Sequence, residues 1–312
     1  MKRAIAIDHG NRMTKTPNFA FPTGVNEEGY VFGINSDRVD YFGKSYVLSE
    51  DRLPQRNDKS DDENFFILTL FAIGYELKEL YESDEKPKSD EVIDLTLLVG
   101  LPPLHYRAMQ NKFRDFFMKR DDRLNFEFNG IKMSINISKV YVYPQAYAAS
   151  LTIAKDLEDY SIANIVDIGG YTTDCVQIAN MELNIDLCTS IHKGIHRLLF
   201  KVNEKVRSQG LQDIPERVIE GIISNDAKTL SNYSRDRIDL VKKEAHKFVL
   251  ELLADVSRTG MDFEQDPIIF MGGGAILLKE PIKETKLIKK AIFIEDAHAN
   301  AKGYELFYEN TN

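Results

Sequence analysis

The stretch "VDIGGYTTDC", from Val166 to Cys175, decides the fold of this chain. An apolar run ends in Asp167, and two glycines separate that acid from a group of hydroxyl side chains. Glycines at a strand end leave backbone N–H groups available to form a concave anion-binding nest. A simple turn needs one glycine at most, so the pair behind an acid indicates a loop that wraps phosphate oxygens.

Two further glycine turns follow apolar strands, "IAIDHGNRMTKT" at 5–16 and "FMGGGAILL" at 270–278. None of the three turns has the spacing of a P-loop or of the GxGxxG dinucleotide motif. Asp8, like Asp167, stands at the carboxyl end of its strand. Carboxylates beside phosphates repel them unless a divalent cation lies between, so we expect Asp8 and Asp167 to hold Mg²⁺ largely through water. Lys15 would return from the next strand to the same phosphates.

Composition limits the classes of function. The 312 residues are 43% hydrophobic and 29% charged, with a formal net charge of −9, which argues against broad nucleic-acid binding. The sequence has no apolar run near the roughly 20 residues of a membrane span, and its first residues do not read as a signal peptide. Two cysteines provide no disulfide framework, so we expect a cytoplasmic protein without membrane contact.

Periodicity predicts alternating strands and helices. Helices are expected at 65–81, 104–119, 144–155, 194–208, 235–258 and 299–310. Pro144 is expected at the first helical position of its helix, where proline is tolerated. Hairpins are expected at 18–33 and around Asn129-Gly130, the latter with a type I′ turn. The region 212–232 reads as irregular.

Both halves of the chain open with a strand ending in Asp-x-Gly, followed by antiparallel strands and then helices. This pattern predicts a duplicated α/β architecture in two lobes. Lobe I is expected over 1–150, with the helix at 299–312 packing back on it, and lobe II over 151–298.

The order of these motifs resembles the actin, hexokinase and heat-shock-chaperone ATPase superfamily. "DIGGYTTD" is similar to that superfamily's D-x-G-x-x-x-T/D phosphate-2 pattern, and "MGGGA" to its adenosine turn. Within it, "VGLPP" (99–103) and "VYPQAYAA" (142–149) look most like bacterial plasmid-segregation actins of the ParM/StbA type. The resemblance implies a two-lobed α/β fold with duplicated mixed sheets, and ATP or GTP with Mg²⁺ as cofactors.

The resemblance also implies roles for individual residues. Asp167 would hold the Mg²⁺–water shell as part of the catalytic apparatus. The β- and γ-phosphates would be wrapped by Gly169, Gly170 and Thr172 from one lobe and by Asp8, Gly10, Asn11 and Lys15 from the other. Three glycines, Gly272, Gly273 and Gly274, would pass under the adenosine. Glu204 or Lys205, on the helix after Gly194, would reach the ribose and base.

Gln145 is the residue expected to act in hydrolysis, because it opens the expected helix where actins carry a glutamine. A glutamine is no strong base, but it can orient a water in line with the γ-phosphate, and positioning is most of what phosphoryl transfer requires. The alternative is a helix-terminal residue that bonds only to backbone amides. Two departures accompany the match: Asn11 stands where actins have serine, and Leu-Ser stands near position 48 where glycine is expected.

The resemblance favours a nucleotide-driven filament that segregates plasmid DNA, with other copies of itself and a DNA-binding adaptor protein as partners and without direct DNA contact. One alternative is a small-molecule kinase of the same fold, which needs an aspartate base; Asp94 and Asp115 are the candidates. Another is a regulatory ATPase that does not polymerise. Such proteins tend to add a membrane-binding tail, for which "YELFYENTN" is short and acidic.

Overall fold

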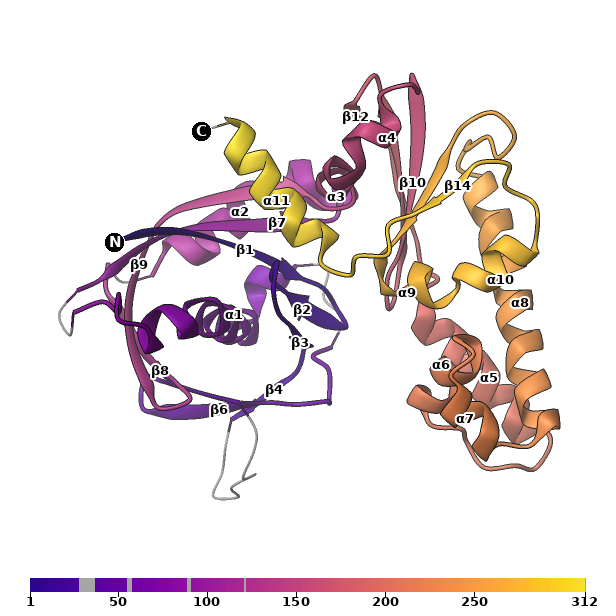
Figure 1. The fold of residues 1–312 in the computed structure, drawn as a ribbon, viewed down its shortest axis with the longest axis horizontal. Helices are drawn as coiled ribbons and strands as arrows, with labels where there is room; N and C mark the ends of the chain where they lie inside the picture. Colours follow the sequence, from indigo (N-terminus) through magenta and orange to yellow (C-terminus); the bar gives the residue numbers. More distant parts are fainter. Residues whose placement is uncertain (28–36, 55–57, 89–90, 121, 312) are drawn as a thin grey trace. The chain divides into compact units, whose positions relative to one another are not determined.

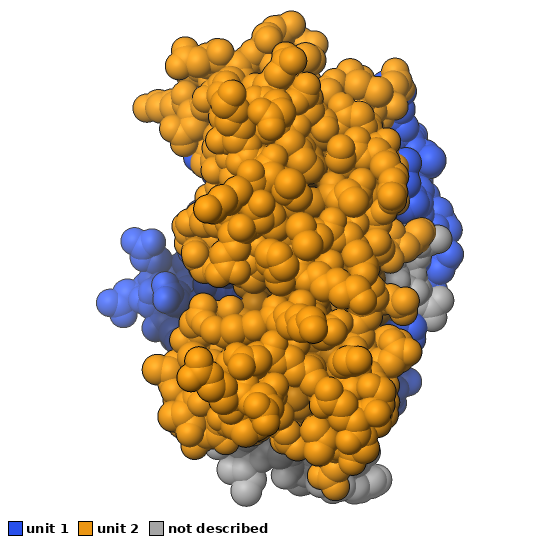
Figure 2. All heavy atoms as spheres, turned by 90° about the vertical axis from the view of Figure 1, so that its right-hand side faces the viewer, with its two compact units in different colours: residues 1–152, 298–312 blue, residues 153–297 orange. Residues whose placement is uncertain are grey.

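The computed structural model describes residues 1–27, 37–54, 58–88, 91–120 and 122–311. The chain divides into two compact units, which Figure 2 shows in different colours (the ribbon is drawn in Figure 1). Unit 1 comprises Met1–Thr152 and His298–Asn312, and unit 2 comprises Ile153–Ala297. Of the helices in the described ranges, none is long and apolar enough to cross a membrane.

Unit 1 contains a mixed sheet in the order β3-β2-β1-β7-β9-β8-β5-β6-β4. Its strands are β1 (Lys2–His9), β2 (Met13–Lys15), β3 (Ala20–Pro22), β4 (Val25–Glu27), β5 (Arg38–Tyr41), β6 (Lys44–Leu48), β7 (Ile93–Leu101), β8 (Leu124–Phe128) and β9 (Ile131–Pro144). The centre is parallel, because β7 pairs with both β1 and β9 in the same direction. The carboxyl ends of these three strands therefore meet at one edge, where Asp8 lies near the end of β1 and Gln145 directly follows β9.

The sheet curls around helix α1 (Glu63–Glu82), which Figure 1 shows enclosed by the strands of unit 1. The two edge strands β3 and β4 are consecutive in the chain and are joined only by Thr23 and Gly24, so the sheet nearly closes on itself. Helix α1 is buried on every side from Phe65 to Gly74, as expected for a helix that is apolar all round. Its N-cap is Asp62, which accepts the backbone N–H of Asn64.

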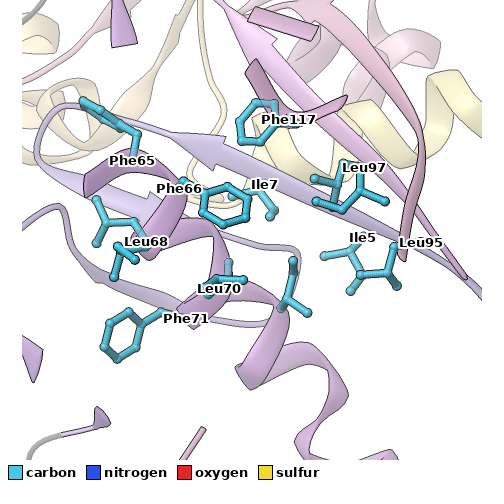
Figure 3. Packing of buried hydrophobic residues seen from close by; sticks show 14 of the residues in the cluster. Ile5, Ile7, Phe65, Phe66, Leu68, Leu70, Phe71, Leu95, Leu97 and Phe117 are labelled. Carbon is cyan, nitrogen blue, oxygen red and sulfur yellow. The ribbon is translucent and has the colours of Figure 1, made fainter. Parts of the chain in front are cut away.

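The core of unit 1 joins α1 to the central strands. Figure 3 shows Phe66 and Leu70 of α1 lying toward Ile7 of β1 and Leu97 of β7, all of them almost fully buried. Truncating a phenylalanine in such a core costs about 3–5 kcal/mol of stability. The opposite face of β1 and β7 packs on helix α11 (Ala299–Thr311), and α2 (Pro103–Met118) packs along β9. Short helices α3 (Tyr147–Ser150) and η2 (Leu151–Ile153) follow β9, and η1 (Lys59–Asp61) precedes α1.

Unit 2 has a five-stranded sheet in the order β12-β11-β10-β13-β14. The strands are β10 (Ile162–Ile168), β11 (Thr173–Ala179), β12 (Glu182–Ile191), β13 (Ile268–Met271) and β14 (Ala291–Phe293). The helices are α4 (Ala154–Leu157), α5 (Ile195–Ser208), α6 (Glu216–Ile223), α7 (Ala227–Asn232), α8 (Arg235–Ser257), α9 (Gly272–Leu277) and α10 (Lys279–Glu284). Helices α5, α6 and α8 contribute most of the helical core.

The two sheets share one topology, which confirms the duplicated mixed sheets. In each, the first strand pairs antiparallel with the second and parallel with a later strand, β7 in unit 1 and β13 in unit 2. The resulting orders are β3-β2-β1-β7-β9 in unit 1 and β12-β11-β10-β13-β14 in unit 2. Unit 1 then adds four strands beyond β9. Asp8 and Asp167 hold equivalent places, near the carboxyl end of the first strand of each repeat.

Several sequence expectations were wrong. The helix expected at 144–155 begins three residues later and is broken into the short pieces α3, η2 and α4, because Pro144 is the last residue of β9, opposite Leu101 of β7. Proline fits there because β8 pairs with β9 only as far as Ile135, so the other side of β9 needs no N–H at that position. The region 212–232 contains helices α6 and α7 rather than irregular chain.

The hairpin expected at 18–33 is also wrong where the structure describes it. Strand β3 pairs with β2, and β4 pairs with β6 instead of β3. The turn expected in this segment lies partly outside the described residues. The hairpin at Asn129-Gly130 is confirmed, with positive φ at both residues.

Candidate functional site

Four of the expected site residues lie in the β1–β2 hairpin: Asp8 near the end of β1, Gly10 and Asn11 in the turn, and Lys15 at the end of β2. Asp8 is only 4% exposed, and the backbone N–H of Gly10 donates to the Asp8 carbonyl over 3.0 Å. A Cβ at Gly10 would lie 2.6 Å from the carbonyl oxygen of Met13, so the turn itself requires glycine. Thr23 closes the loop by donating its hydroxyl to the Gly10 carbonyl at 2.7 Å.

Two side-chain amides hold the carboxylate of Asp8. Gln145 donates from Nε2 to Oδ1 at 2.7 Å, and Asn300 donates from Nδ2 to Oδ2 at 3.3 Å. All three side chains are buried. The structure thus brings together the aspartate and the glutamine that the sequence singled out, and it adds Asn300 from α11, which the sequence analysis missed.

Gln145 occupies the turn between β9 and α3 and does not open a helix. Its backbone N–H donates to the carbonyl of Leu101 at 2.8 Å, continuing the β7–β9 ladder. The next residue, Ala146, has a φ of 63°, and no side chain caps α3. The alternative role as a helix cap is therefore wrong for Gln145, because its amide bonds to Asp8 and not to a helix terminus.

Lys15 can offer a positive charge to an anion, and the side-chain oxygen of Asn11 can accept a hydrogen bond from a donor such as water. Lys15 stands directly opposite Asp8 in the β1–β2 register, so both side chains lie on the same face. It forms no ion pair with the residues that the structure describes. The Oδ1 atom of Asn11 is buried and likewise has no hydrogen-bond partner within the described ranges.

The second loop lies between β10 and β11 of unit 2. The N–H of Gly169 donates to the carbonyl of Thr172 at 2.8 Å, which makes the turn tight. The first residues of α5 hold this turn in place. The N–H group of Ile195 donates to the carbonyl of Gly169 at 3.1 Å, and that of His196 donates to the carbonyl of Gly170 at 2.8 Å. In addition, the ring of His196 stacks on Tyr171 with centroids 4.7 Å apart.

Asp167 is the next-to-last residue of β10 and is half-buried. It pairs in register with Asp174 of β11, so two carboxylates share one face at this sheet edge. Like charges directly opposite are unfavourable unless something compensates them, which suits a nearby cation. No group of three or more His, Cys, Asp or Glu side chains in the described part of the chain could hold a metal by itself, so Mg²⁺ would need phosphate oxygens and water as well.

The three glycines at the start of α9 differ in how much space a side chain would have. A Cβ at Gly272, where φ is +85°, would lie 2.2 Å from Oδ1 of Asp167, and one at Gly274 would meet Ile168 at 2.5 Å. At Gly273 a Cβ would meet nothing within 4 Å. Packing within unit 2 therefore explains Gly272 and Gly274, whereas no described atom of the chain requires glycine at position 273. Glu204 and Lys205 are exposed on α5.

His9, next to Asp8, points to the opposite face of β1. Its Nε2 lies 2.8 Å from the hydroxyl of Thr69, and its ring packs on Phe117. Burial, and secondarily the charge of Lys59, lower the pKa of His9 from 6.5 to about 3. Lys59 is only 6% exposed and donates to the carbonyl of His9. A buried ammonium group thus holds the end of β1, next to Asp8, by a hydrogen bond.

Two protein-family models match this chain. The family model for the actin-like proteins' N-terminal domain matches residues 6–147, and the model for the C-terminal part of the archaeal MreB-like actin homologue matches residues 165–284. Together they account for most of the chain. The chain is an actin-like protein. No curated protein sequence matches it.

Solved structures show that this actin-like protein shares the fold of ParM and of archaeal actins. The psk41 ParM protein superposes with a TM-score of 0.71 at 19% identity, covering 99% of this chain and 98% of the other. The archaeal actin homologue Ta0583, solved with ADP, gives 0.74 at 16% identity, covering 99% of both chains. A 15-stranded ParM filament from Clostridium botulinum gives 0.71 at 19% identity, covering 99% of both.

Proposed function

We propose that this actin-like protein binds Mg-ATP or Mg-GTP and polymerises into filaments that segregate plasmid DNA. The observation that carries the proposal is the contact of Gln145 with Asp8 at the end of the first phosphate-type loop. It joins a residue that can orient water to a residue that can face Mg²⁺ and phosphate. The ADP complex of Ta0583 and the ParM filament, which share the fold, support nucleotide binding and self-association.

In this proposal each unit contributes one loop to the same phosphates. Asp8, Gly10, Asn11 and Lys15 act from unit 1, and Asp167, Gly169, Gly170 and Thr172 act from unit 2. Bound Mg²⁺ would neutralise phosphate charge, and Asp8 and Asp167 would hold its water shell. Gly273 would pass under the adenosine, and Glu204 or Lys205 would reach the ribose.

Gln145 would position the water that attacks the γ-phosphate. A carboxylate oxygen can only accept hydrogen bonds, so Asp8 fixes Nε2 of Gln145 toward itself and turns Oε1 away. A carbonyl oxygen held in this way can accept a hydrogen bond from water and aim its lone pair, without needing to act as a strong base. Hydrolysis in the assembled subunit would then loosen the filament.

The kinase alternative has less support. Asp94 pairs with Lys2 at the start of β1, six residues before Asp8, which is about 20 Å away at the rise of a strand. Asp94 therefore lies too far away to act as a base on a phosphoryl group held at Asp8. Asp115 is partly buried on α2 and pairs with Arg114. The acidic chain also fits a separate adaptor protein as the DNA-binding partner better than direct DNA contact.

Light scattering of the pure protein after addition of Mg-ATP or Mg-GTP, with electron microscopy of the product and phosphate release in parallel, tests this function. Filaments with phosphate release support the proposal. Nucleotide binding without any pelletable polymer, across protein concentration, salt and slowly hydrolysed analogues, would favour the regulatory ATPase. Phosphate transfer to an added small molecule would favour the kinase.

A further inference from the structure

Asn300 bridges the two elements that carry the candidate hydrolytic residues. Its Nδ2 donates to Oδ2 of Asp8 at 3.3 Å, and its Oδ1 accepts the backbone N–H of Ala146 at 2.9 Å. Ala146 directly follows Gln145 and has a φ of 63°, a conformation that an alanine seldom adopts. Asn300 is only 8% exposed, so these bonds form away from solvent.

The chemistry of the partners fixes the orientation of both amides. A carboxylate only accepts and a backbone N–H only donates, so flipping the Asn300 amide would put oxygen against oxygen and nitrogen against nitrogen. The same argument orients Gln145, whose Nε2 faces the other oxygen of Asp8. The side chains of Gln145 and Asn300 thus hold one carboxylate between them, and Asn300 also holds the turn on which Gln145 sits.

Helix α11 holds Asn300 firmly. At Gly303 a Cβ would lie 2.1 Å from the carbonyl oxygen of Ala148, so α11 touches the backbone of α3. At Gly100 a Cβ would lie 2.0 Å from the hydroxyl of Tyr304, so the same helix also touches β7. Neither contact leaves room for α11 to slide, and Asn300 lies one turn before them.

We infer that Asn300 is a positioning residue: it acts through Asp8 and Ala146 to set the orientation of Gln145, and it makes hydrolysis depend on the docking of α11. The inference rests on the proposed function. It assigns to the last helix of the chain a role in the rate of hydrolysis and not in nucleotide binding as such.

A double-mutant cycle of Asn300→Ala and Gln145→Ala tests the inference. We expect Asn300→Ala to lower the single-turnover hydrolysis rate by about 10-fold or more, with a much smaller change in the Kd for Mg-nucleotide. In the Gln145→Ala background, Asn300→Ala should lower the rate no further, because residues that act through one another are not additive. A full additional loss in the double variant would overturn the inference.

Asn300→Asp separates the two bonds of Asn300, because it keeps an acceptor for Ala146 and loses the donor to Asp8. Asn129 offers a matched control in the same unit: its Oδ1 accepts the N–H of Arg38 at 2.8 Å, and its Nδ2 donates to Asp37 at 2.7 Å. It lies at the far end of β9 from Gln145. We expect Asn300→Asp to hydrolyse at least as slowly as Asn300→Ala, and Asn129→Asp to hydrolyse normally.

Amide hydrogen exchange provides a readout that does not depend on hydrolysis. Asn300→Ala should speed exchange in the peptide that contains Ala146, whereas Asn129→Asp should leave that peptide unchanged. Normal exchange there, or a normal hydrolysis rate combined with a lowered melting point, would show that Asn300 is merely structural. If the unaltered protein binds and hydrolyses no nucleotide, the proposed function fails first, and the inference falls with it.

Discussion

Gln145 donates its side-chain amide to the carboxylate of Asp8 at 2.7 Å, across 137 positions of sequence. Gln145 directly follows β9, and Asp8 is the next-to-last residue of β1. These two strands flank β7 in the parallel centre of unit 1. Strand order therefore places the side-chain amide of Gln145 beside the carboxylate of Asp8 without help from any loop insertion. The consequences can be tested one residue at a time.

Replacing Gln145 by alanine should slow hydrolysis while leaving the phosphate loops in place. We expect a loss of about 10- to 1,000-fold, or roughly 1.4 to 4 kcal/mol of barrier, because positioning of the water is lost and the electrostatic part of catalysis remains. Filaments should persist longer, since their subunits stay in the triphosphate state. Phosphate release per assembled subunit measures this, and an unchanged rate beside a lowered melting point would remove Gln145 from the mechanism.

Replacing Asp167 by alanine should weaken the binding of Mg-nucleotide by about 10- to 100-fold, the usual cost of losing a group that orients a metal's ligands. Calorimetry with and without Mg²⁺ measures the effect, which should shrink when Mg²⁺ is absent. Asp159, exposed in the same unit, provides the control. Equal affinity for the Asp167→Ala and Asp159→Ala variants would rule out the assignment of Asp167.

Alanine at Gly273 should leave stability intact and lower nucleotide affinity. Its added methyl meets no protein atom within 4 Å, but it would press on a nucleotide that passes under this turn. Such overpacking costs about 1–3 kcal/mol, or ~5- to 150-fold in Kd.

The neighbouring Gly272 supplies the contrast. Alanine there should instead lower the melting point, because φ is +85° and Asp167 lies 2.2 Å from the added atom. Melting curves and nucleotide titrations of both variants distinguish the two mechanisms. If Gly273→Ala binds nucleotide normally, the adenosine does not pass over this glycine.

Stability should fall in mild acid because of His9. Its pKa is lowered from 6.5 to about 3 in the folded chain, so below pH 6.5 the unfolded chain takes up a proton that the folded chain excludes. The unfolding free energy should therefore drop by about 2 kcal/mol from pH 7 to pH 5 through this group. Urea titrations of the protein and of His9→Gln measure the difference.

Nuclear magnetic resonance gives a direct check on the same residue. The ring protons of His9 should show no titration between pH 5 and pH 8 in the folded protein. A midpoint near 6.5 would contradict the burial described here.

The sequence by itself determined the local chemistry. Strand-end aspartates followed by glycine turns, the Asn129-Gly130 hairpin and the apolar helix after Asp62 all depend on near neighbours, so they could be predicted. The repeated Asp-x-Gly opening likewise predicted the shared sheet topology of the two units. Period-two alternation separates His9, which faces α1, from Asp8, which faces α11.

Only the tertiary structure decided how distant groups meet. Pro144 looked like the start of a helix, but pairing of β9 with β7 up to Leu101 outweighs that local preference. Asn300, 292 positions from Asp8, gave no signal beyond an asparagine near the start of the last helix. Local sequence records which conformations and bonds a residue can make, but the partner of a buried amide is chosen by strand order and helix docking, which depend on the whole core.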